Sequence, residues 1–158
     1  MRSFRLVGLE PGRFDPLFTL DDAQLRAHGA IRVRADTSPG FPCRISLQDA
    51  QPGDELLLLP FEHQPANSPY RASGPIYVRR GSQQATLAAG ELPTYVTGRV
   101  ISLRAYDDKD MIVDAGVAEG DALRGEVERL LRDPRVRYLH LHNAKRGCFS
   151  CRVERVDA

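Results

Sequence analysis

The chain has 158 residues and a formal net charge of +1 at pH 7, and 42% of its residues are hydrophobic. This length and composition exclude a disordered chain, and we expect a single domain over residues 1–158 with one buried core. The near-neutral charge without a basic stripe argues against a nucleic-acid binder, and no apolar segment approaches the length that a membrane span needs.

Apolar residues that alternate, or that run together, predict about nine strands in chain order. They cover residues 4–10, 30–36, 43–47, 55–61, 76–80, 99–107, 111–116, 136–143 and 148–156. Between the first two, the segment TLDDAQLRAHGA indicates a helical turn that begins after Thr19 or Asp21 and ends at Gly29.

The segment EHQPANSPYRASGP, residues 62–75, contains three prolines and several small polar residues. This composition predicts a long loop, and loops of such length in a compact domain are usually functional or mobile. The loop carries His63, Tyr70, Arg71 and Ser73 as polar side chains.

One strong helix is predicted over residues 119–133, before Pro134. Its apolar residues Leu123, Val127, Leu130 and Leu131 fall on one face at helical spacing. With about nine strands, the chain is expected to form an α+β domain with a largely antiparallel sheet, and the strand count allows a barrel-like closure.

The segment YLHLHNAKRGCFSC, Tyr138 to Cys151, concentrates the polar chemistry of the chain. His140 and His142 are two apart on a strand, so both imidazoles point to one face. They could bind a metal ion if His63 or Glu62 supplied a third ligand, but two histidines do not complete a site. A hydrogen-bonding or ligand-binding role is therefore the preferred interpretation, with metal as the alternative.

The cysteines do not form a recognisable framework. Residues three apart on a strand face opposite ways, so Cys148 and Cys151 are not expected to form a disulfide, and Cys43 lies alone. An odd number of cysteines in one chain indicates a reducing cytoplasm.

Cys148 could act as a nucleophile. It follows a turn containing Lys145 and Arg146, whose charges would favour the thiolate, and His142 on the neighbouring strand could be the base. An inert buried cysteine is the commoner alternative.

Arginines suggest a third kind of site. Arg44, Arg71, Arg104 and Arg146 each lie in or beside one of these polar segments, with Tyr70 and Ser73 as further donors. If they gathered in one place, they would suit a carboxylate or a phosphate.

Four stretches carry a family resemblance: PGFPCRISL, SPYRASGPIYVR, SLRAYD and VRYLHLHNAKRGCFSCRVERV. Through them, the chain resembles the bacterial domain-of-unknown-function family 1203 over nearly its whole length. His140, His142, Asn143, Gly147 and Cys148 fit the wording of the family's usual ending, whereas Cys151 stands where the family accepts other residues. The resemblance implies a small cytosolic bacterial protein and carries no catalytic assignment.

We therefore expect a small, anionic molecule to bind in a pocket between the 62–75 loop and the 136–151 hairpin. The expected contacts are Arg44, Tyr70, Arg71, Ser73, His140, His142, Asn143 and Arg146. Tyr70 or Arg71 should approach the His140/His142 face, and binding should strengthen as pH falls and the histidines protonate. An enzyme using Cys148 and His142, or a metal, is the alternative; an interaction module is the third. A homo-oligomer is possible, and the cofactor is left unassigned.

Overall fold

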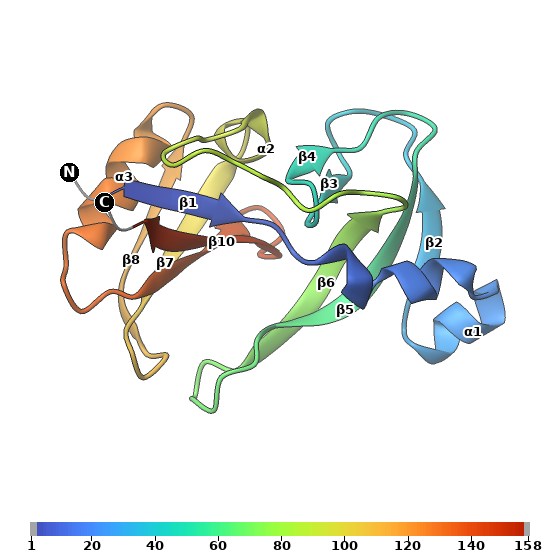
Figure 1. Ribbon diagram of the computed structural model, residues 1–158, viewed down its shortest axis with the longest axis horizontal. Coiled ribbons are helices and arrows are strands. Elements are labelled where there is room, and N and C mark those ends of the chain that lie inside the picture. The colour runs from blue at the N-terminus through green and yellow to red at the C-terminus, as the bar shows by residue number, and fades with distance from the viewer. Residues whose placement is uncertain (1–2, 157–158) are drawn as a thin grey trace.

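The computed structural model describes residues 3–156 and arranges their ten strands in two five-stranded sheets (Figure 1). Sheet A has the spatial order β1 (Ser3–Val7), β10 (Phe149–Val156), β9 (Tyr138–Asn143), β7 (Val100–Tyr106) and β8 (Ile112–Glu119). Sheet B has the order β2 (Ile31–Arg34), β5 (Glu55–Gln64), β6 (Ala72–Arg79), β3 (Pro42–Cys43) and β4 (Gln48–Asp49). All pairs are antiparallel except β3 with β6. The α+β class is confirmed, but neither sheet closes, so the barrel-like closure is wrong.

Short helical segments connect and cover the strands. They are η1 (Pro11–Arg13), η2 (Asp15–Thr19), α1 (Asp22–Ala27), α2 (Thr94–Thr97) and α3 (Ala122–Leu131). Asp21 is the N-cap of α1: its carboxylate accepts the Gln24 N–H at 2.8 Å, and the Gln24 side chain accepts the Asp21 N–H at 2.9 Å. The structure thus selects Asp21 over Thr19. None of the described helices is both long and apolar enough to cross a membrane.

Helix α3 covers one face of sheet A, as its apolar pattern predicts. Leu123, Val127, Leu130 and Leu131 are all at most 2% exposed. They pack against Ile101, Leu103, Ala105, Leu139, Leu141 and Val153 from the sheet. Because these strand residues alternate, the opposite face of sheet A carries the polar and aromatic partners Arg104, Tyr106, Tyr138, His140 and His142.

Sheet B has a core of its own. Phe14, Phe18 and Leu25, from the N-terminal helical segments, pack on Leu57, Leu59, Ile76 and Val78. Phe149, the first residue of β10, belongs to this second core although its strand lies in sheet A. The two sheets therefore share a boundary to which Phe149 contributes from sheet A.

The predicted strand over residues 43–47 is wrong. Strand β3 ends at Cys43, and residues 44–47 form a turn that the Leu47 N–H closes on the Cys43 carbonyl at 3.0 Å. The apolar alternation arises because this buried turn serves both cores: Ile45 packs in the core of sheet B and Leu47 in that of sheet A.

The long loop predicted over residues 62–75 is also wrong. Strand β5 continues to Gln64 and β6 begins at Ala72, so most of this segment is a hairpin with a short connection. A bulge lies between Phe61 and Gln64. Pro60 and Pro75 are opposite each other in the ladder. Proline lacks the N–H that donates a hydrogen bond in the ladder. Because the two prolines form one cross-strand pair, the missing hydrogen bonds are confined to that one position.

The chain path determines how the sheets are joined. Sheet A takes strands from both ends of the described chain, whereas sheet B is built from residues 31–79 between them. The β5–β6 hairpin and the β7–β8 hairpin extend beyond the sheets on the same side of the molecule (Figure 1). The surfaces between the sheets are therefore formed by segments far apart in the sequence.

Candidate functional site

A cleft of about 670 Å³ lies at the boundary of the two sheets. On the side of sheet B it is lined by Pro39, Gly40, Pro42, Arg44, Leu58, Pro75 and Tyr77. On the side of sheet A it is lined by Gly98, Arg99, Val100, Glu119, Asn143, Ala144, Lys145, Arg146 and Cys148. Its size is within the range of small-molecule sites.

Four cationic side chains line this cleft, against the single carboxylate of Glu119. Arg99 forms an ion pair with Asp49, with a second contact at 3.1 Å, and also donates to the Tyr95 carbonyl at 2.7 Å. Its guanidinium is thereby held in one place. Lys145 and Arg146 are exposed at the tip of a turn, so the cleft combines fixed and adjustable cations.

Arg44 is the most buried of these cations, at 3% exposed. Its Nε donates to the Phe149 carbonyl at 2.8 Å, and its Nη1 donates to the Pro42 carbonyl at 2.7 Å. The first bond crosses from sheet B to sheet A. Arg44 therefore has a structural role in joining the sheets as well as a place in the cleft wall.

The turn that carries Lys145 and Arg146 is fixed at its base. The Gly147 N–H donates to the Asn143 carbonyl at 2.8 Å, and the Asn143 N–H donates to the Cys148 carbonyl at 2.9 Å. Gly147 has φ of 79°, in the left-handed region that glycine adopts without strain. The base of the turn is therefore rigid while its two cations face solvent at the mouth of the cleft.

Cys148 lines the cleft and is half-buried, and all three cysteines are free thiols. The proposed base, His142, donates from Nδ1 to the Gly147 carbonyl at 2.9 Å and packs against Phe149 between the sheets. Among the described residues, no hydrogen bond joins Cys148 to a histidine. Cys151 lies in the core of sheet A, where burial raises the pKa of its thiol to about 12.

The histidines form a separate cluster on the inner face of sheet A, away from the cleft lining. His63 from β5 lies over both strand histidines, with ring centroids 6.2 Å from His140 and 4.9 Å from His142. Phe149 stacks on His63 at 5.4 Å. Nδ1 of His63, Nδ1 of His140 and Nε2 of His142 are buried without a hydrogen-bond partner. Strand alternation explains why His140 and His142 share a face, as the sequence pattern predicts, whereas the sequence indicates His63 only as a candidate third metal ligand.

Burial keeps these imidazoles neutral. Desolvation, followed by the neighbouring His142, lowers the pKa of His140 to about 3. Desolvation lowers the pKa of His142 to about 4, although its bond to Gly147 opposes the shift. His140 and His142 therefore stay neutral near neutral pH. For this reason, we do not expect their protonation to strengthen anion binding in that range. Within residues 3–156, no group of three His, Cys, Asp or Glu side chains is arranged to hold a metal ion.

Tyr70 contacts Tyr106 at the edge of this cluster, whereas the sequence predicted that Tyr70 or Arg71 would form one pocket wall with the His140/His142 face. Its ring meets Tyr106 edge-on at 6.3 Å, and Tyr106 lies 4.9 Å from His140. Arg71 instead pairs with Glu62 at 3.1 Å on the surface, and Ser73 is exposed on β6. The rings of Tyr70, Tyr106 and His140 therefore form a packed layer at this edge of the histidine cluster.

Three of the sequence-predicted contacts, together with the candidate nucleophile, line the cleft: Arg44, Asn143, Arg146 and Cys148. The structure does not bring His140, His142, Tyr70, Arg71 or Ser73 to its lining. Sequence reasoning missed Tyr77, Arg99 and Lys145. Lys145 stood inside the polar segment already singled out, but no pattern connected Tyr77 or Arg99 to that segment, because the contact depends on how the two sheets meet.

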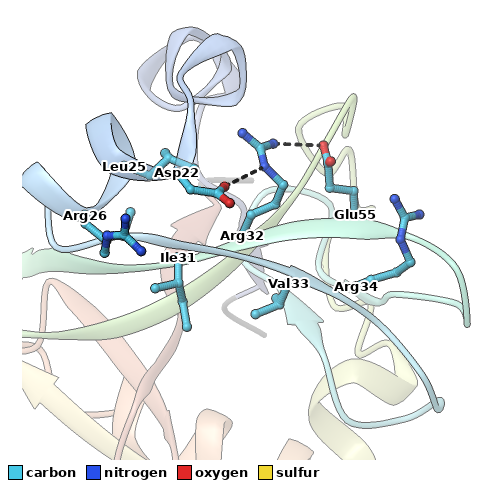
Figure 2. Close-up of a pocket in the computed structure, with 9 residues that line it drawn as sticks. Asp22, Leu25, Arg26, Ile31, Arg32, Val33, Arg34 and Glu55 are labelled. Carbon is cyan, nitrogen blue, oxygen red and sulfur yellow. Dashed lines mark ion pairs between the residues drawn. The ribbon is translucent and has the colours of Figure 1, made fainter.

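A second hollow, of about 380 Å³, lies between α1 and β2 (Figure 2). Arg32 at its centre reaches Asp22 at 3.8 Å and Glu55 at 3.3 Å. These ion pairs, drawn as dashed lines in Figure 2, offset much of the cationic charge there. The hollow is therefore less suited to an anion than the cleft between the sheets.

Comparison with known proteins gives the family and no more. Residues 40–155 match the family described as "Protein of unknown function (DUF1203)". The chain belongs to this family. No curated protein and no solved structure matches it. The matched segment includes every residue of the cleft lining except Pro39, so the cleft lies almost wholly within the part of the chain that defines the family.

Proposed function

We propose that the protein binds a small anionic molecule in the cleft between sheets A and B. The observation that carries the proposal is the charge of the lining: Arg44, Lys145, Arg146 and Arg99, the last of which is paired with Asp49, against Glu119. A concave site lined by one sign of charge, with low-dielectric walls, concentrates ions of the opposite sign.

The arrangement of the cations supports the same function. Arg44 and Arg99 are oriented by hydrogen bonds to carbonyl groups before any ligand arrives. Binding an anion there would cost little side-chain ordering, which is the advantage of a preorganised site. Lys145 and Arg146, exposed beside them, can move to meet the ligand.

The test is isothermal titration of the protein with inorganic phosphate, acetate and 2-naphthoate at low ionic strength. Reversing both exposed cations, in Lys145→Glu/Arg146→Glu, should weaken binding of every anion that binds the wild type by at least about tenfold, or about 1.4 kcal/mol. Lys109→Glu is the control, because Lys109 is the other lysine of the chain and is exposed on the distant β7–β8 turn.

Added salt should weaken anion binding by the wild-type protein, because exposed charges are screened at high ionic strength. The affinity for acetate and 2-naphthoate, whose own charge is constant in this range, should change little between pH 6 and pH 8, because no histidine lines the cleft. If Lys109→Glu weakened binding as much as the double variant, the effect would be one of net charge and the cleft would not be the site.

A further inference from the structure

The two walls of the cleft differ in chemistry. On the side of sheet B, the lining apart from Arg44 is Pro39, Gly40, Pro42, Leu58, Pro75 and Tyr77, none of which carries a charge. On the side of sheet A, the lining includes Arg99, Lys145 and Arg146 together with the amide of Asn143. The side of sheet B thus offers mainly apolar surface, whereas the side of sheet A carries three of the four cations and also the carboxylate of Glu119.

The centre of the apolar wall is a cross-strand pair. Tyr77 of β6 lies directly opposite Leu58 of β5, so their side chains share one face of sheet B. Both are half-buried, and Phe41 meets the Tyr77 ring edge-on at 5.3 Å. This contact restricts the ring from one side, so Tyr77 offers an oriented surface against which an apolar group can pack.

Three prolines extend this surface. Pro39 lies in the segment before β3, Pro42 is the first residue of β3, and Pro75 precedes Ile76 in β6. Prolines have a restricted backbone and few side-chain rotamers, so covering them costs little conformational entropy. An inorganic ion would leave this wall exposed to water, because it has no apolar surface to place there.

We infer that the ligand of the cleft is an amphiphilic anion: a planar or aliphatic body that packs on the Leu58–Tyr77 wall and carries a carboxylate or phosphate group toward Arg99, Lys145 and Arg146. This inference rests on the proposed function and adds the class of ligand. It also accounts for a cleft of about 670 Å³, far more space than one oxyanion occupies.

The experiment, at pH 8 where both phosphates are close to doubly ionised, compares probes with the same charged group that differ in their apolar body. Binding of 2-naphthoate is measured against acetate, and phenyl phosphate against inorganic phosphate, by isothermal titration. The aromatic member of each pair should bind at least about tenfold more tightly. Tyr77→Ala should remove most of that difference by weakening binding of the aromatic anion more than binding of the small one.

Leu58→Ala is the second variant, in case loss of the Tyr77 ring against Phe41 disturbs folding. Each variant is compared with wild type by circular dichroism and thermal unfolding before titration. If the small anions bind as tightly as the aromatic ones, the inference is overturned and the proposed function stands. If an aromatic preference exists but survives both Tyr77→Ala and Leu58→Ala, the apolar wall is not its source and the inference is again overturned. If none of the four probes binds, both fail.

Discussion

Arg44 donates from Nε to the carbonyl oxygen of Phe149 at 2.8 Å, across the boundary between the two sheets. The guanidinium is 3% exposed and also holds the Pro42 carbonyl. A buried charge that satisfies two backbone acceptors is destabilising to remove, because the acceptors lose their partner in a place that water does not reach. This contact connects the stability of the fold to the wall of the cleft.

Replacing Arg44 with Met should therefore lower the free energy of unfolding by about 2–4 kcal/mol. Arg34→Met is the matched control, since Arg34 also donates to a carbonyl, that of Gly53, but is exposed. The control should cost less than about 1 kcal/mol. Urea denaturation measures both, and equal losses would contradict a special role for the buried bond.

Leu130→Ala should lower the free energy of unfolding by about 2–5 kcal/mol, because Leu130 is fully buried in the core of sheet A and the change leaves a cavity. Val117→Ala, at a position 66% exposed on β8, should have little effect. Both variants are compared by thermal or urea unfolding. A negligible shift for Leu130→Ala would mean that the packed face of α3 tolerates its loss.

Acid should destabilise the fold through the histidine cluster. The pKa of His140 is lowered to about 3 and that of His142 to about 4, both below the ordinary 6.5 of an unfolded histidine. The unfolded chain therefore binds protons first as pH falls. The stabilisation from these groups is fully present above about pH 6.5 and is lost toward pH 4, by about 1.4 kcal/mol per pH unit for each histidine.

His140→Phe removes one of these titrating groups and should flatten the fall in stability between pH 6.5 and pH 4. The groups facing His140 that remain are His63, His142, Arg104 and Arg152, none of which supplies a compensating negative charge. His28→Gln, at an exposed histidine, is the matched control. Urea unfolding over this pH range is the measurement, and an unchanged slope in His140→Phe would contradict the assignment.

Tyr138 links the two long hairpins. Its hydroxyl accepts from the Gln64 side chain at 3.0 Å and donates to Asp110 at 2.6 Å. Tyr138→Phe should lower the free energy of unfolding by about 1–3 kcal/mol and increase amide hydrogen exchange in both hairpins. Tyr70→Phe is the control, because Tyr70 is exposed. Unchanged exchange in Tyr138→Phe would show that the hairpins are held without this link.

Much of the fold follows from local pattern. The face of α3, the cap at Asp21 and the common face of His140 and His142 depend on residues a few positions apart, so the sequence predicts them well. The segment 43–47 is an example in which local pattern predicts the wrong structure. Its alternation is typical of a strand, but Ile45 and Leu47 enter different cores through a turn. Only the arrangement of the two sheets distinguishes these possibilities.

The candidate site was predictable in part for the same reason. Arg146 and Cys148 belong to one turn, and Asn143 stands at its base, so the sequence brings them together. Tyr77 and Arg99 reach the same cleft from β6 and from the residue before β7. Local pattern does not indicate that these distant segments meet. The common face of His140 and His142 follows from strand alternation, but their burial depends on Phe149 and His63, whose stacked rings pack against both.

The order of strands in sheet A has a consequence for synthesis on the ribosome. Strand β10 lies between β1 and β9, so β1 leaves the exit tunnel long before its partner exists. The strands of sheet B emerge consecutively and can pair while translation continues. Sheet A must instead hold an unpaired first strand until β10 has been synthesised, and this nascent edge is where a chaperone or an aggregating neighbour would compete with native pairing.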